Sequence, residues 1–214
     1  MLRKCVFAAA CAVLAAATAA PARADVLSLT GETLSANTAN PSTSTTGSGT
    51  CNQSGTSTFD FTASGIAGPT YPGTFTETGT VTFGPVVADP ITGNLAAQPT
   101  SLQASFTIYS GATTITGTKT LSTTLHQGGN FASCFTGDAF GYQAAADYTA
   151  IISTPTGTFR DTGISSVDIF TVGFDPSGGF QFVETFTSTG MAPCDPNSQQ
   201  NQTQGGNQQG CQHP

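Results

Sequence analysis

Hydrophobic and polar side chains alternate one for one along much of the chain. In residues 71–85, YPGTFTETGTVTFGP, threonine occupies every even position from 74 to 82, while the odd positions read Phe75, Glu77, Gly79, Val81 and Phe83. Alternation with a period of two is typical of a β-strand that buries one face and exposes the other. No segment shows a convincing helical period, so the pattern predicts strands almost throughout.

The alternating segments predict an all-β fold, made of a single antiparallel domain of about eight strands. Turn sequences such as Tyr-Pro-Gly at 71–73 and Asp-Pro-Ser-Gly-Gly at 175–179 separate the strands, and short connections favour antiparallel hairpins. Such a set forms either a closed barrel or a two-sheet sandwich, and the alternation does not choose between them. The strands are expected near residues 57–64, 73–84, 102–109, 112–123, 143–153, 157–163, 166–174 and 179–188.

The first 24 residues have the parts of a secretory signal peptide. A basic start, MLRK, precedes an apolar run, and Ala22-Arg23-Ala24 has the small-x-small form of a cleavage site. The alternative is a membrane anchor, but the run is alanine-rich and shorter than the ~20 strongly apolar residues that a span needs. We therefore expect a secreted protein, extracellular or in the cell envelope, with no membrane span after cleavage.

Composition divides the rest of the chain into three parts. Residues 25–50 are expected to be an N-terminal arm, with VLSLTGETL as a short strand or ordered segment, followed by a Ser/Thr-rich linker. Residues 51–190 form the β-domain, which has an ordinary size for a single core. Residues 191–214 are a Gln/Asn-rich tail that is expected to be disordered.

Four cysteines remain after signal cleavage, and an even number in an oxidising compartment indicates disulfides. We favour Cys51–Cys134 within the domain and Cys194–Cys211 in the tail, although three connectivities are possible. The chain contains no CxxC motif and only two histidines, so no metal site and no cofactor is expected.

Charge excludes one class of partner. Removing the signal leaves two basic residues, Lys119 and Arg160, against twelve acidic ones, a formal net charge of −10. Nucleic-acid affinity depends largely on basic side chains that neutralise phosphates, so this chain is not expected to bind nucleic acid. An outer-membrane barrel is also disfavoured, because the chain has no tryptophan, only four tyrosines and threonine on its outer face.

Rows of threonine recur in residues 112–123 and 182–189. Threonine suits an exposed strand position, because its β-branch fits extended backbone and its hydroxyl meets water. The alternative is a flat hydroxyl array that binds ice, crystalline polysaccharide or mineral. Such an array needs rows in register, and here unlike segments separate the rows, so we favour the solvated sheet face.

The opposite face of these strands carries charges. Glu77 lies between Phe75 and Val81, Glu184 lies between two phenylalanines, and Lys119 lies in another apolar row. Because an uncompensated buried charge is strongly destabilising, we expect Lys119 to neutralise Glu77, Glu184 or both, and Asp161 could join them. Three interpretations stay open: an ion pair that fixes strand register, charges near a solvated rim, and the polar floor of a ligand pocket.

Catalytic chemistry is sparse. A serine or cysteine nucleophile needs a base, and His126 is the only histidine before the tail. Glu77 and Glu184 could serve as the two carboxylates of a glycosidase, but the chain has no tryptophan to form an aromatic platform. No phosphate-binding glycine loop, EF-hand or HExxH motif occurs. We expect no enzymatic activity.

The run YPGTFTETGTVTFG, with ITGTKTL some forty residues later and FVETFTSTG near the end, resembles a pattern in exported bacterial β-rich domains that have no known activity. The resemblance covers about residues 51–190 and implies an extracellular β-rich domain. It assigns no role to any residue.

The sequence thus predicts a secreted, non-catalytic β-domain with a binding or structural role at or near the bacterial cell surface. One alternative is a barrel that binds a small ligand through Glu77, Lys119 and Glu184, and another is the two-carboxylate hydrolase. The partner itself, a cell-surface component or a small ligand, is not identified by the sequence.

Overall fold

The computed structural model describes residues 27–37, 42–50, 52, 54–88, 95–124, 129–131, 139–172 and 180–194. These residues form ten strands and no helix. The described part of the chain therefore contains no helix that could cross a membrane. The strands are β1 (Thr33–Ala36), β2 (Ser44–Thr50), β3 (Ser57–Gly68), β4 (Gly73–Ala88), β5 (Leu95–Ser110), β6 (Thr113–Leu121), β7 (Gly129–Phe131), β8 (Ala139–Thr154), β9 (Gly157–Val172) and β10 (Gln181–Pro193).

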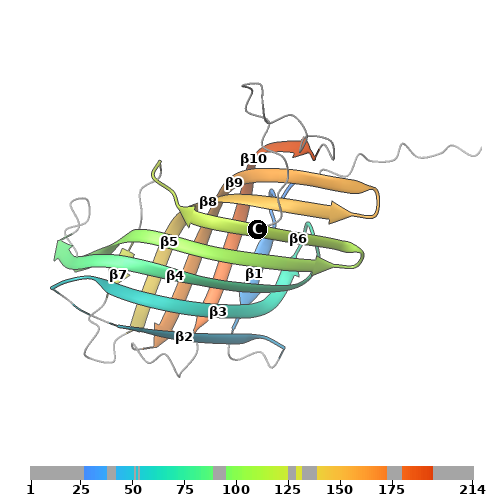
Figure 1. Cartoon of the computed structure of the whole chain (residues 1–214). Coiled ribbons are helices and arrows are strands. Elements are labelled where there is room, and N and C mark those ends of the chain that lie inside the picture. The colour runs from blue at the N-terminus through green and yellow to red at the C-terminus, as the bar shows by residue number, and fades with distance from the viewer. Residues whose placement is uncertain are drawn as a thin grey trace, which may run out of the picture.

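All strands belong to one antiparallel sheet, with the order β1-β10-β9-β8-β6-β5-β4-β3-β2 and with β7 paired to β8. The short strand β1 pairs with β10 and also with the end of β3, so the hydrogen-bonded pairings run in a ring. Strands β1 and β2 pair with the same edge of β3, one after the other along its length. In Figure 1, β3 to β6 form a front layer that crosses β1 and β10 behind it.

The all-β antiparallel prediction is confirmed, with differences in detail. The expected number of strands is slightly low, and the two strands expected at 157–163 and 166–174 are a single strand, β9. The segment expected as an arm and linker contributes β1 and β2, because backbone pairing with β3 can hold a polar strand such as STTGSGT without apolar side chains. Strand β10 runs three residues into the expected tail. The expected signal peptide and residues 195–214 lie outside the described residues.

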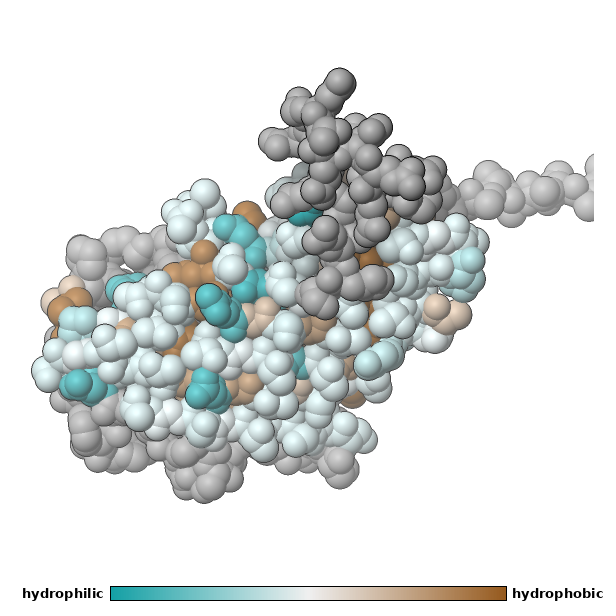
Figure 2. Space-filling view, viewed as in Figure 1, coloured by the Kyte–Doolittle hydropathy of each residue, from teal (hydrophilic) through white to brown (hydrophobic). Residues whose placement is uncertain are grey.

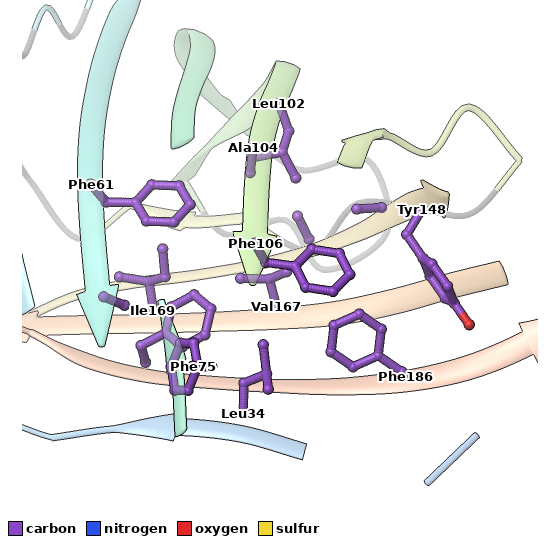
Figure 3. Close-up of a cluster of buried hydrophobic side chains, with 14 of the residues drawn as sticks. Leu34, Phe61, Phe75, Leu102, Ala104, Phe106, Tyr148, Val167, Ile169 and Phe186 are labelled. Carbon is purple, nitrogen blue, oxygen red and sulfur yellow. The ribbon is translucent and has the colours of Figure 1, made fainter. Parts of the chain in front are cut away.

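Aromatic and aliphatic side chains from nearly every strand fill the interior (Figure 3). The burial pattern of β3 alternates along its length, so that Phe59 and Phe61 point inward while Asp60 and Thr62 face solvent. Phe106 and Phe186 lie beside each other with ring centroids 5.3 Å apart, and Tyr148 packs edge-on against Phe186 at 5.2 Å. These three rings surround the place where the charged residues meet.

Inward-facing glycines make room for some of these rings. A Cβ at Gly117 would lie 2.4 Å from the ring of Phe106, and one at Gly79 would lie 2.7 Å from the ring of Phe61. Glycine therefore interrupts the apolar rows of β4 and β6 because a neighbouring aromatic ring already occupies the space.

Candidate functional site

Three charged side chains from three different strands meet in the interior. Glu77 on β4, Lys119 on β6 and Glu184 on β10 each point inward, because each occupies a buried position of an alternating strand. Lys119 Nζ lies 2.5 Å from Oε2 of Glu77 and 2.5 Å from Oε2 of Glu184, and all three side chains are fully buried. Of the three interpretations, the buried ion pair therefore describes the geometry, and the solvated rim does not.

Lys119 contacts both carboxyl groups at once. Nζ donates a hydrogen bond to Oε2 of Glu184 and lies equally close to Oε2 of Glu77. One lysine thus faces two carboxylates and cannot neutralise both of them.

Burial raises the pKa of Glu77 well above its usual value, and the adjacent charge of Glu184 raises it further, while Lys119 only partly opposes both effects. The cluster is therefore a neutral Glu77 carboxyl group beside a Lys119–Glu184 ion pair. This arrangement leaves no net charge in the interior, which satisfies the strong penalty on an unpaired buried ion.

Aromatic rings complete the surroundings of Lys119. Its Nζ lies 5.0 Å from the ring centroid of Phe106 and 5.6 Å from that of Phe186, both within the range of a cation–π interaction. Register places these residues together: Glu77 pairs with Phe106 between β4 and β5, and Lys119 pairs with Tyr148 between β6 and β8. Apart from its amine and two carboxyl groups, the site is therefore lined by buried aromatic rings.

Asp161 does not join this cluster and forms a second one beside it. Its Oδ2 accepts hydrogen bonds from the backbone N–H of Leu29 at 2.8 Å and from the hydroxyl of Tyr148 at 2.9 Å. Its Oδ1 accepts a hydrogen bond from Ser188 at 2.5 Å. Burial raises the pKa of Tyr148, and the charge of Asp161 raises it further, so this phenol stays protonated and donates.

A fourth buried carboxylate, Glu32, was not predicted. It lies on the N-terminal segment just before β1, is fully buried, and accepts a hydrogen bond from the backbone N–H of Tyr71 at 2.7 Å. Burial raises the pKa of Glu32 although this bond opposes the effect. The only signal in the sequence is its position between Leu29 and Leu34, which are both in the core.

The outward faces of the strands hold hydroxyl groups in register. One row runs across seven strands, and pairing aligns each member with the next: Thr46, Thr62, Thr78, Ser105, Thr118, Thr149 and Thr162. A second row runs beside it through Ser44, Ser64, Thr76, Thr107 and Thr116. Unlike segments do separate the threonine rows along the chain, but β5 lies between β4 and β6 and presents hydroxyls of its own at the matching positions.

Other chemistry is limited within the described residues. They hold no group of three or more His, Cys, Asp or Glu side chains that could bind a metal ion. Cys51, Cys134 and Cys211 lie outside them, so the disulfide connectivity with Cys194 stays a prediction. No protein-family model, curated protein or solved structure matches this chain.

Proposed function

We propose that this chain is a secreted, non-catalytic β-domain that binds a neutral, repetitive polysaccharide surface at or near the bacterial cell surface. The observation that carries the proposal is the pair of outward hydroxyl rows that pass in register across β2 to β6. Neighbouring strands lie about 4.8 Å apart, and alternate residues along a strand lie about 6.8 Å apart, so the hydroxyls form a regular grid.

The chemistry of this face suits an uncharged partner rich in hydroxyls. Each threonine or serine hydroxyl can donate one hydrogen bond and accept others, which matches the hydroxyls of a sugar. The face over the front layer has intermediate hydropathy, with only scattered strongly polar or apolar residues (Figure 2). Asp60 and Asp147 flank the longer row, and Asp60 accepts a hydrogen bond from Thr80 at 2.6 Å.

An exposed aromatic ring adjoins the grid. Tyr109 is 54% exposed and pairs with Thr74 on β4 and Thr114 on β6, at the end of the hydroxyl face. Tyrosine combines an apolar ring with a polar tip, which suits contact with the mixed surface of a sugar. This ring favours polysaccharide over ice or mineral as the partner.

The interior supports an outer rather than an inner binding surface. Glu77, Lys119 and Glu184 contact one another and are closed off by packed rings, so a small ligand would reach them only after the core had opened. The same burial disfavours the hydrolase alternative. Both carboxylates contact Nζ of Lys119, so no room is left for a sugar between them. We also propose that the ring of pairings is a closed barrel rather than a sandwich, because β1 joins β10 to β3.

The test is retention of the purified protein on insoluble cellulose, chitin and peptidoglycan. Thr78→Val and Thr118→Val remove hydroxyls from the middle of the longer row with little change of shape, and Tyr109→Ala removes the aromatic edge. We expect each to reduce retention, while the matched Thr187→Val on β10, outside both rows, leaves it unchanged. No retention of the wild-type protein at high concentration, or equal retention of all variants, would overturn the proposal.

A further inference from the structure

The buried cluster of Lys119, Glu77 and Glu184 holds the functional groups needed to form a covalent bond, in addition to an ion pair. A primary amine lies 2.5 Å from two carboxyl groups at once, in a site without exposed surface. Proximity of this kind replaces a bimolecular encounter with an intramolecular one, which removes much of the entropic barrier to reaction.

The two carboxyl groups lie at the same distance from the amine but differ in protonation. Glu184 accepts a hydrogen bond from Nζ, so it is placed to take a proton from the amine. Oε2 of Glu77 also lies 2.5 Å from Nζ, and burial favours the neutral form of this carboxyl group, which is the form that a nitrogen can attack. We therefore assign Glu184 as the base and Glu77 as the electrophile.

We propose that Lys119 and Glu77 form an intramolecular amide bond, with Glu184 as the general base. The Lys119 ammonium gives one proton to the Glu184 carboxylate, and the freed Nζ lone pair attacks Cδ of the neutral Glu77 carboxyl group. The Cδ–OH bond of Glu77 breaks, its hydroxyl leaves with a second proton from Nζ as water, and a C–N bond takes its place. The products are one amide, one water molecule and a neutral Glu184 carboxyl group, so atoms and charge balance without another reactant.

The surroundings favour each part of this step. Phe106 and Phe186 enclose the amine and hold it against the two carboxyl groups. Burial and Glu184 keep the proton on Glu77, and a neutral carboxyl group accepts a nucleophile far better than a carboxylate does. The reaction also replaces a buried ion pair with uncharged groups, which removes the desolvation penalty of both ions.

The bond would join the two strands that flank β5. Glu77 pairs with Phe106, and Lys119 pairs with Ala104. The link therefore crosses β5, and its two ends lie opposite positions of β5 that are two residues apart. The cross-link would hold β4, β5 and β6 in one register and close the chain between residues 77 and 119.

Intact mass spectrometry of the reduced and denatured full chain tests the proposal. The matched control is Lys119→Arg, which keeps the positive charge but whose guanidinium is a poor nucleophile. After correction for the substituted residue, we expect the wild-type mass to be lower than that of the variant by one water molecule. Equal corrected masses would overturn the proposal, and this outcome does not depend on polysaccharide binding.

Peptide mapping then tests the assigned roles. We expect chymotryptic peptides that contain Glu77 and Lys119 to be recovered as one covalently joined species. Glu184→Gln keeps both bonding partners but removes the base, so the same peptides should be recovered separately from this variant. A link between Lys119 and Glu184 would overturn the assignment, and so would a full yield of the link in the Glu184→Gln protein. Circular dichroism of each variant establishes that the fold is retained.

Discussion

Oδ2 of Asp161 accepts a hydrogen bond from the backbone N–H of Leu29 at 2.8 Å, across 132 residues of sequence. The bond holds the segment before β1 against β9, and Gly31 and Phe186 add backbone hydrogen bonds between this segment and β10. A buried carboxylate therefore anchors the N-terminal part of the domain to its C-terminal strands.

Replacing Asp161 with alanine should destabilise the domain by about 2–5 kcal/mol, because it leaves the Leu29 N–H and the Tyr148 hydroxyl buried without an acceptor. Tyr148→Phe removes only one of these donors and should cost about 1 kcal/mol. Urea unfolding of the two variants gives both values. An Asp161→Ala protein no less stable than Tyr148→Phe would show that Asp161 does not anchor the segment.

Lys119→Met should lower the free energy of unfolding by about 3–5 kcal/mol, because it leaves Glu77 and Glu184 together in the interior without a cation. Replacing all three residues with apolar side chains of similar volume should recover most of this loss. Thr120→Ala, at an exposed position beside Lys119 on β6, should change stability by less than about 0.5 kcal/mol. An unchanged thermal midpoint for Lys119→Met would contradict the structure of the cluster.

Gly117→Ala should destabilise the domain by about 1–3 kcal/mol, because the added Cβ would lie 2.4 Å from the ring of Phe106 and 2.9 Å from the carbonyl oxygen of Thr149. Gly84→Ala on β4 is the matched control, since its Cβ would lie 3.6 Å from the nearest atom. Thermal unfolding of both proteins makes the comparison. Equal midpoints would mean that Phe106 does not pack on Gly117.

Glu32 should make stability depend on pH in a defined direction. Because burial raises its pKa in the folded state above the usual 4.5, the folded protein holds this proton more tightly than the unfolded chain does. Its contribution is fully present below pH 4.5 and is lost as the pH rises through the folded-state pKa. Glu32→Gln keeps an acceptor for Tyr71 but cannot titrate, so the difference in unfolding free energy between wild type and variant should shift against the wild type as the pH rises. A constant difference across that range would refute the assignment.

Alternation alone predicted the central features of this molecule. It located β4, β6 and β10 and identified Glu77, Lys119 and Glu184 as charges on inward faces, because a charge in an apolar row stands out at a period of two. It divided β9 because Gly163 and Ser165 occupy inward positions without an apolar side chain. Phe186, which pairs with Ser165 from β10, helps to fill that part of the interior instead.

Other features depend on partners that the sequence does not bring together. The acceptor role of Asp161 needs the backbone of Leu29, and the alignment of hydroxyl rows needs the pairing of β5 with strands unlike it. Strand β2 has polar or small residues on both faces, so no periodicity marks it, and only its ladder with β3 makes it a strand.

The ring closes where β1 meets both β3 and β10. One of these neighbours, β3, follows β1 closely in the chain, and the other, β10, is the most C-terminal of the described strands. A nascent chain that lacks β10 therefore has an open edge on β1, and pairing between such distant segments comes late because loop closure opposes it. The ring of pairings can therefore close only after β10 has been made.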